Sequence, residues 1–465
     1  MGPSRLAHLF EGQRASDHPV AIAGDQVFRF DQFGRSVAAV AALVETTGRG
    51  RWLLASQDAW GFAIGFFGLL RAGCTIVIPP NHLPATQRRL LPDIVGALTD
   101  QDPSTQELKT KDLARSGPIW HRIPEPGEAF PQPVSLEDST IEFWTSGSSG
   151  ESKCISKRLS QLDAEVEILE KTFGRHLHSG PVLGTVPHQH IYGCLFRILW
   201  PLASGRPFII DQCVDPNQFR SLITRFKVSS LVSSPALLAR LPGLLNLDTF
   251  FPVASAVFSS GGPMNASDAR GWLKWAPTGV LEIFGSTETG GIAWRVQSEE
   301  PHSANWKPFP DITLAFDSDG ALLINSFRAG SLPVRMEDAG EPLSDGCFRL
   351  LGRLDRIVKL EEKRVSLPEL EAELEAHPWI SQAAVTRLDG PRAVLGAVIV
   401  LAEDRPRLTP QEWRSLGWTF RQFLLTRFEA VAIPKCWRIV TELPYNESGK
   451  LTPQSLASLF AEPGD

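Results

Sequence analysis

The feature that most constrains the fold is an alternation of short apolar runs with helical patterns. Phe62, Phe66 and Leu70 share one helical face, and Thr75–Ile78 follows as a strand after a glycine turn. Strand–helix–strand units of this kind build sheets with mainly parallel strands. The pattern therefore predicts an α/β fold.

The same alternation returns after a polar, proline-dotted stretch over residues 100–137, which is interpreted as a connector. The second stretch is expected to contain strands at Thr140–Trp144, 182–186, 207–210, Ser229–Ser233 and Ala254–Ser259, and helices near 161–173, 194–203 and 217–226. Short strands and turns from about 311 to 352 predict a small β-subdomain. Ser366 followed by Glu369 predicts a capped helix start, with the helix continuing to about His377.

Length and composition limit the class of protein. With 465 residues, 43% of them hydrophobic and 21% charged, the chain can bury a sizeable core. A net charge of −6 without a long basic run argues against a nucleic-acid partner. The most apolar run is interrupted by Arg71, and the N-terminus has no apolar signal region, so we expect no membrane span.

The six cysteines are widely spaced and include no C-x-x-C pair. This usage suits reduced thiols and predicts a cytoplasmic protein. Disulfides are the alternative for an even number of cysteines.

The segment Thr145–Lys153 directly follows a predicted strand. It contains Thr145, Ser146, Gly147, Ser148, Ser149, Gly150 and, at its end, Lys153. Backbone N–H groups, hydroxyls and an ammonium are the groups that bind a polyphosphate, although the spacing is not that of a Walker A loop. A flexible Ser/Gly linker is the alternative, and the preceding strand and closing lysine argue against it.

The pattern T-S-G-S-S-G-x-x-K closely resembles the phosphate loop of the adenylate-forming superfamily, which includes acyl- and aryl-CoA ligases, peptide-synthetase adenylation domains and luciferase. Six further segments resemble that superfamily's motifs in order, over nearly the whole chain. The resemblance implies a large N-terminal domain, residues 1–354, with two α/β subdomains and the small β-subdomain. It also implies a small mobile α+β C-terminal domain, residues 355–465.

Pro187–Gly193 is similar to the family's P-x-x-H-x-x-G segment, and this implies that His190 borders the acyl pocket beside the substrate carboxylate. A metal site is the alternative. His176 with His178, and His188 with His190, are H-x-H pairs that would face one way on a strand, although no cysteine or carboxylate completes a ligand set.

Two glycine-containing segments resemble the family's adenine-binding motifs. Their residues are Gly261, Gly262 and Pro263 in the first, and Phe284, Gly285, Ser286, Thr287 and Glu288 in the second. The resemblance implies that Phe284 stacks on adenine, that Thr287 contacts phosphate and that Glu288 holds Mg²⁺. By themselves, both segments could be ordinary turns.

Three residues further along resemble motif positions that bind the ribose or join the domains. Asp338 is similar to the aspartate of T-G-D, with Glu337 in place of the glycine, which implies a contact to the ribose hydroxyls. Gly352–Asp355 resembles G-R-x-D. It implies that Arg353 contacts ribose or phosphate and that Asp355 is the hinge between domains.

The C-terminal motifs bear on the two half-reactions. Lys450 matches the lysine of L-P-x-[NT]-x-x-G-K, which bridges the acyl carboxylate and the α-phosphate, so the implied catalytic residues are Lys450, His190 and Lys153. Glu362 replaces a glycine that lines the thiol tunnel in relatives, and this departure concerns the second half-reaction.

The implied activity is ATP- and Mg²⁺-dependent activation of a carboxylic acid to acyl-AMP, with release of pyrophosphate and transfer of the acyl group to a thiol. CoA and an acyl carrier protein are the possible acceptors. The short length and the EEKRVSLPELE run are similar to short stand-alone ligases of aryl-polyene or fatty-acid-like pathways, which favours a carrier protein.

An aryl or fatty acid is the expected substrate. An amino acid is less expected, because residues 186–202 include no acidic residue to hold an amine and instead include Ile191, Leu195, Phe196 and Trp200. A nucleotide-binding protein that has lost catalysis is the remaining alternative. The retained Lys153, Glu288, Arg353 and Lys450 argue against it.

Overall fold

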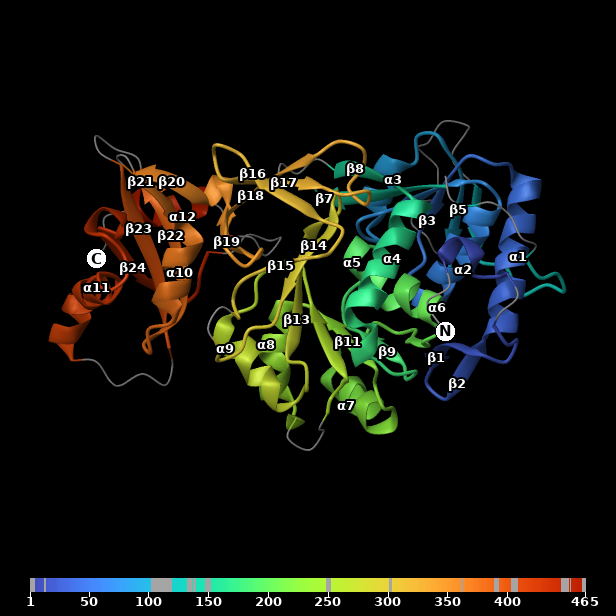
Figure 1. Ribbon diagram of the computed structural model, residues 1–465, viewed down its shortest axis with the longest axis horizontal. Coiled ribbons are helices and arrows are strands. Elements are labelled where there is room, and N and C mark those ends of the chain that lie inside the picture. Colours follow the sequence, from blue (N-terminus) through green and yellow to red (C-terminus); the bar gives the residue numbers. More distant parts are fainter. Residues whose placement is uncertain are drawn as a thin grey trace. The chain divides into compact units, whose positions relative to one another are not determined.

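Figure 1 shows the computed structural model of the chain. The structure describes residues 5–11, 14–101, 119–131, 136, 139–146, 152–247, 252–300, 303–360, 363–388, 393–402, 409–444, 451 and 453–461. The chain forms two compact units, Met1–Thr313 with Ile324–Val334, and Leu314–Leu323 with Arg335–Asp465. The predicted α/β class is confirmed. The boundary between residues 354 and 355, with its hinge at Asp355, stays a prediction.

The first unit contains a nine-stranded sheet in the order β15-β14-β13-β12-β11-β9-β10-β1-β2. Its strands are β1 (Pro19–Ala23), β2 (Gln26–Arg29), β9 (Val182–Gly184), β10 (Phe208–Ile209), β11 (Ser230–Ser233), β12 (Ala256–Ser259), β13 (Val280–Ser286), β14 (Gly290–Arg295) and β15 (Lys307–Pro308). The strands from β13 to β1 in this order run parallel, and β14, β15 and β2 are antiparallel at the edges. The parallel centre gives the sheet one edge where carboxyl ends of strands gather.

A six-stranded sheet in the order β6-β5-β3-β4-β7-β8 completes the β-structure of the first unit. Its strands are β3 (Arg51–Leu54), β4 (Thr75–Ile78), β5 (Ile94–Thr99), β6 (Ile119–Arg122), β7 (Thr140–Ser146) and β8 (Ser152–Arg158). All are parallel except β8, which returns antiparallel to β7. The prediction of a simple connector over residues 100–137 is wrong at β6, an edge strand with little buried surface.

Helices pack around these two sheets (Figure 1). The helices are α1 (Phe30–Thr47), α2 (Ala59–Arg71), α3 (Pro84–Leu90), α4 (Leu159–Phe173), α5 (Ile191–Gly193), α6 (Trp200–Ser204), α7 (Pro216–Arg225), α8 (Pro235–Leu244) and α9 (Ala266–Gly271). Asp58 caps α2 by accepting a hydrogen bond from the Gly61 main-chain nitrogen at 2.6 Å. The helix predicted near 194–203 is present, with a π-helical segment over Cys194–Leu199 between α5 and α6.

The second unit contains most of a four-stranded sheet, together with a hairpin, a three-stranded sheet and three helices. The strands are β16 (Thr313–Phe316), β17 (Ala321–Asn325), β18 (Val334–Pro342), β19 (Phe348–Arg353), β20 (Ile357–Leu360), β21 (Lys363–Ser366), β22 (Ile380–Leu388), β23 (Val394–Leu401) and β24 (Cys436–Val440), and the helices are α10 (Leu367–Glu375), α11 (Pro410–Leu424) and α12 (Pro453–Ala461). The Ser366 side chain accepts a hydrogen bond from the Glu369 main-chain nitrogen at 3.3 Å, so the predicted capped start of α10 is confirmed.

None of the helices that the structure describes combines the length and apolar character needed to cross a membrane. All six cysteines belong to the described residues, and no disulfide joins any of them.

Candidate active site

Three of the predicted segments lie at the carboxyl ends of parallel strands in the nine-stranded sheet. Pro187–Gly193 follows β9, Ser260–Pro263 follows β12, and Phe284–Glu288 spans the end of β13 and the turn after it. The Ser260 hydroxyl donates a hydrogen bond to the Ile283 carbonyl oxygen at 2.8 Å, which joins the second segment to the third. This edge is where ligands bind in open α/β sheets.

The third segment is a tight hairpin turn between β13 and β14. A Cβ atom on Gly285 would lie 2.1 Å from the Gly290 carbonyl oxygen, so only glycine fits there. The Ser286 main-chain nitrogen donates to the hydroxyl of the fully buried Thr289 at 3.2 Å. The half-buried Phe284 ring lies 5.5 Å from the Trp306 ring, measured between centroids. The tight turn thus requires a glycine at position 285, in addition to the nucleotide-binding role that the resemblance implies for Gly285.

The predicted phosphate loop is the connection of the β7–β8 hairpin. Thr145 pairs with Lys153, and Ser146 pairs with Ser152. Gly147, Ser148, Ser149 and Gly150 lie outside the described residues. The strand β8 that closes the hairpin is absent from the sequence prediction.

Lys153 and Glu288 come together from the two different sheets of the first unit. The Lys153 Nζ atom lies 2.6 Å from Glu288 Oε1, in a pair whose side chains are 64% and 35% exposed. Burial alone would raise the pKa of Glu288, but the hydrogen bond and charge of Lys153 outweigh it and the pKa is lowered. An ionised carboxylate of this kind suits Mg²⁺, which prefers oxygen ligands and needs only one or two carboxylates beside substrate phosphates.

Sequence reasoning missed Lys157, which reaches the same turn from the other end of β8. This side chain is only 3% exposed, and its Nζ atom donates to the main-chain oxygens of Glu288 at 2.5 Å and of Arg328 at 2.7 Å. Burial lowers the pKa of Lys157 to about 8. The period of two in β8 is the signal that could have found it, because Lys157 shares the inward face with Ile155.

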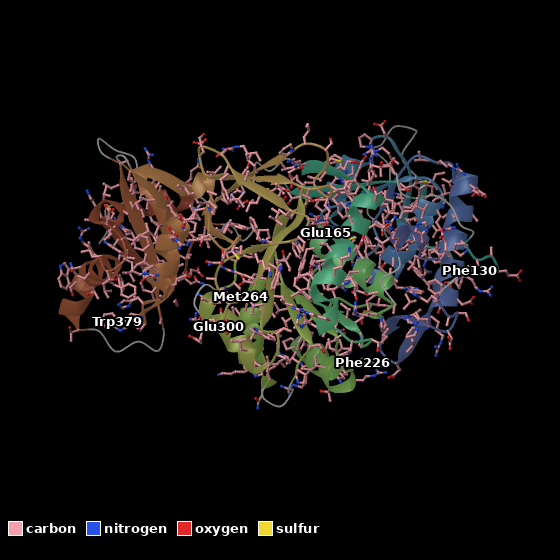
Figure 2. The ribbon with its side chains drawn as sticks, viewed as in Figure 1. Phe130, Glu165, Phe226, Met264, Glu300 and Trp379 are labelled. Atoms are coloured by element: carbon pink, nitrogen blue, oxygen red, sulfur yellow. The ribbon has the colours of Figure 1, made fainter. Side chains whose placement is uncertain are left out.

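A buried ion network lies behind the turn. Arg328, 1% exposed, donates to both oxygens of Asp311 at 2.6 and 2.9 Å, and its Nη1 atom lies 3.3 Å from Glu165 Oε1. Glu165 also accepts a hydrogen bond from the Gly291 main-chain nitrogen at 2.7 Å. Figure 2 shows Glu165 on α4. The sequence signal for this network is a glutamate on the apolar face of a helix, between Leu162 and Leu169.

The two histidines of the segment Pro187–Gly193 have different surroundings. The His188 Nε2 atom donates to the Ser56 carbonyl oxygen at 3.1 Å, and burial, with the nearby Arg197, lowers its pKa to about 3. His190 keeps an exposed side chain, and desolvation by surrounding atoms still lowers its pKa. A Cβ atom on Gly193 would lie 2.0 Å from the Pro187 oxygen, which explains the glycine of this segment.

The metal alternative for the histidine pairs lacks structural support. Neither pair lies on a strand, and His188 and His190 differ in exposure rather than facing one way. Among the residues that the structure describes, no three His, Cys, Asp or Glu side chains form a group that could hold a metal ion.

The second unit contains the predicted ribose residues. Asp338 on β18 is the cross-strand partner of Arg353 on β19. The Arg353 Nη2 atom lies 2.5 Å from an oxygen of Glu337, the residue that replaces the family's glycine. Asp355 lies in a short 3-10 helix, Leu354–Arg356, while Glu362 and Lys450 lie outside the described residues.

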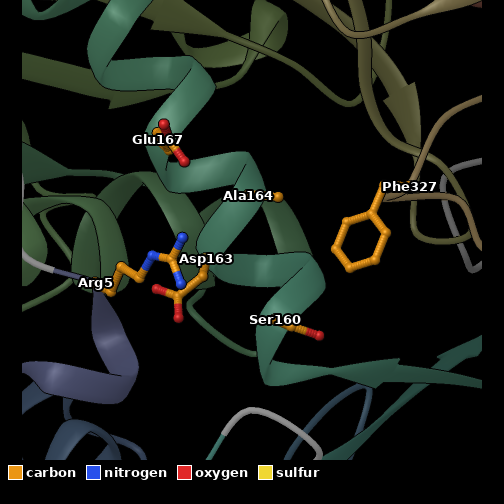
Figure 3. Close-up of a pocket in the computed structure, with 6 residues that line it drawn as sticks. All are labelled: Arg5, Ser160, Asp163, Ala164, Glu167 and Phe327. Carbon is orange, nitrogen blue, oxygen red and sulfur yellow. The ribbon is translucent and has the colours of Figure 1, made fainter.

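Figure 3 shows a pocket of about 210 Å³ in the first unit, beside α4. Arg5, Ser160, Asp163, Ala164, Glu167 and Phe327 line it. None of the residues predicted to bind nucleotide or metal lines this pocket, so it plays no part in the candidate active site.

Comparison with known proteins provides independent information. The sequence pattern of the family described as AMP-binding enzyme matches residues 11–325. A 4-coumarate–CoA ligase of Cereibacter sphaeroides is 30% identical over 66% of this chain and 69% of its own length. Pyochelin synthetase PchE of Pseudomonas aeruginosa is 26% identical over 79% of this chain, which spans 28% of PchE.

Solved structures share the fold at lower sequence identity. ATP-bound MatB from Rhodopseudomonas palustris matches with a TM-score of 0.82, over 99% of both chains, at 18% identity. The match spans both compact units of this chain.

Proposed function

This chain belongs to the family of AMP-binding enzymes, and from that premise we propose that it activates an aryl or fatty acid as an acyl-adenylate and passes the acyl group to a thiol. The predicted superfamily and enzyme class, a ligase of the acyl-CoA synthetase kind, are confirmed. ATP with Mg²⁺ is the cofactor set of this family.

The observation that carries the proposal is the meeting of Lys153 and Glu288. A lysine at the end of the β7–β8 hairpin and a carboxylate on the β13–β14 turn lie 2.6 Å apart although 135 residues separate them in the chain. A polyphosphate site needs a cation for the phosphates and a hard oxygen ligand for the metal. The pair supplies both, beside the predicted phosphate loop.

The proposed chemistry is an in-line displacement. A carboxylate oxygen of the acid attacks the α-phosphorus of ATP, the new phosphorus–oxygen bond forms, and the bond to pyrophosphate breaks. Mg²⁺, when bound, neutralises phosphate charge, and Glu288 is the residue that would hold it. Lys153 and the hydroxyl of Thr145 are proposed to bind phosphate oxygens, as are Ser146, Gly147, Ser148, Ser149 and Gly150.

The remaining residue roles are part of the same proposal. His190 orients the acid carboxylate, and Lys450 bridges that carboxylate and the α-phosphate. The backbone of Gly261, Gly262 and Pro263, with the ring of Phe284, borders the adenine. Asp338 and Arg353, which are cross-strand partners, contact the ribose.

The acyl acceptor is proposed to be the phosphopantetheine thiol of a carrier protein, with CoA as the competing acceptor. The relatives include both kinds of enzyme by name, CoA ligases and a peptide synthetase. Glu362 stands in the position of a tunnel glycine and supports an acceptor site that differs from that of the CoA ligases.

The test is ATP–pyrophosphate exchange across aryl acids, medium- and long-chain fatty acids and amino acids, with Mg²⁺ present. We expect exchange with aryl or fatty acids, followed by an acyl-thioester product identified by mass on a carrier protein or on CoA. ATP binding without exchange for any acid would overturn the proposed activity and favour a protein that has lost catalysis.

A further inference from the structure

Two lysines of one strand reach a single residue. Lys153, Ile155 and Lys157 share one face of β8, because side chains on a strand alternate with a period of two, and this face is buried at Ile155 and Lys157. Lys153 contacts the Glu288 carboxylate at 2.6 Å, and Lys157 contacts the Glu288 main-chain oxygen at 2.5 Å. The side chain and the main chain of Glu288 are therefore bound separately.

The turn that contains Glu288 is also bound on its other side. Glu165, on the buried face of α4, accepts the hydrogen bond of the Gly291 main-chain nitrogen at 2.7 Å. Lys157 in turn donates to the Arg328 main-chain oxygen at 2.7 Å, and Arg328 pairs with Glu165. Buried charges from β8 and α4 thus hold the turn before and after Thr289.

We propose that Lys157 is a positioning residue for the metal ligand, fixing the main chain at Glu288 so that its carboxylate presents to the metal in one orientation. This proposal rests on the proposed function, in which Glu288 holds Mg²⁺. Residues behind the ligands of a metal orient them, and their loss commonly weakens metal binding 10- to 100-fold.

The burial of Lys157 argues for such a role over simple packing. An ammonium that is 3% exposed costs free energy of desolvation, which an apolar side chain of similar length would avoid. Both of its acceptors are carbonyl oxygens in turns, and the one at Glu288 belongs to the candidate metal ligand itself. The lysine therefore fixes a segment that no sheet ladder fixes at that point.

The experiment compares Lys157→Met with Lys157→Arg, using Lys171→Met as the matched control. Lys171 is an exposed lysine of α4 that pairs only with Glu167 among the ion pairs of the described residues. Binding of Mn²⁺–ATP is titrated by electron paramagnetic resonance, and the Mg²⁺ dependence of pyrophosphate exchange is measured in parallel. Unfolding in urea reports stability separately.

We expect Lys157→Met to raise the Mn²⁺ and Mg²⁺ half-saturation concentrations about tenfold or more. Lys157→Arg should recover part of the loss, and Lys171→Met should behave as wild type. If Lys157→Met does not fold, Lys157→Gln, which keeps a donor but loses the charge, is measured in the same way. An unchanged metal half-saturation in the folded Met or Gln variant overturns the proposal, even where stability has dropped.

Glu288→Gln separates the failure of this inference from the failure of the proposed function. If Glu288→Gln leaves Mn²⁺ binding unchanged, the metal assignment in the proposed function is wrong. If Glu288→Gln weakens Mn²⁺ binding and Lys157→Met does not, only the positioning role is wrong.

Discussion

In the first unit, the turn with Glu288 is bound by Glu165, and Glu165 forms an almost fully buried ion pair with Arg328, with side-chain exposures of 4% and 1%. The other partner of Arg328, Asp311, is 32% exposed. In the second unit, the motif arginine Arg353 pairs with Glu337 at the surface, with side-chain exposures of 44% and 70%. Breaking a buried pair leaves an uncompensated charge, whereas an exposed pair contributes little. The first unit thus holds the turn with Glu288 through buried charges, whereas the second unit holds its motif arginine in an exposed pair that contributes little to stability.

The largest expected effect is on the buried network. Arg328→Met should lower the free energy of unfolding by about 3–5 kcal/mol, because the carboxylate of Glu165 stays buried without its partner. Urea unfolding measures this. Arg270→Met is the control, since Arg270 pairs with Glu299 at 39% and 87% exposure and should change stability by less than about 1 kcal/mol. Similar losses in the two variants would remove the contrast between buried and exposed pairs.

The next effect is kinetic and concerns the C-terminal motif. Lys450→Ala should lower the rate of adenylation by about 10²–10³-fold with folding unchanged, because one charge that binds the transition state is lost. ATP–pyrophosphate exchange measures the rate, and circular dichroism checks folding. A normal exchange rate would refute the assignment of Lys450.

A smaller effect is expected from pH acting on a buried histidine of the first unit. The folded pKa of His188 is about 3, below the ordinary value of 6.5, so the unfolded chain binds a proton that the folded chain does not. The free energy of unfolding is therefore unaffected by this group above pH 6.5. As the pH falls below 6.5 toward the folded pKa, it decreases by about 1.4 kcal/mol per pH unit. Unfolding free energies of wild type and His188→Gln between pH 7 and 5 measure it. If the unfolding free energies of the two proteins change equally with pH, the lowered pKa of His188 is contradicted.

The smallest effect belongs to the exposed pair of the second unit. Glu337→Gln should change the free energy of unfolding by about 0–1 kcal/mol, because water screens the pair with Arg353. Thermal or urea unfolding measures the change. A loss of stability as large as that of Arg328→Met would show that the exposed pair contributes as much to stability as the buried one.

Much of the fold could be predicted from local patterns in the sequence. Thr75–Ile78 is a strand with the predicted bounds, and Ser366 caps a helix as its spacing to Glu369 indicates. Two of the strands that were not predicted, β6 and β8, are edge strands, where fewer side chains are buried and the apolar alternation is weak. Buried strands were also left unpredicted, including β5 (Ile94–Thr99) and β23 (Val394–Leu401), whose apolar runs are too short to be told from helix by periodicity alone.

The candidate site was predictable only in part. The motif segments lie at strand ends where they were expected, but no local rule indicates that Lys153 meets Glu288, since the contact joins two sheets. Lys157, Glu165 and Arg328 belong to none of the motifs that the sequence revealed. In the sequence, such residues can be noticed only as charged side chains at positions where the helix or strand pattern predicts an apolar one. Only the packed structure shows that these charges contact one another.

The β7–β8 hairpin has a consequence for how this chain tolerates insertions and deletions. One residue added between Lys153 and Lys157 would turn one of the two lysines to the opposite face of the sheet. A change of length is therefore forbidden over the four positions that lead from Lys153 to Lys157.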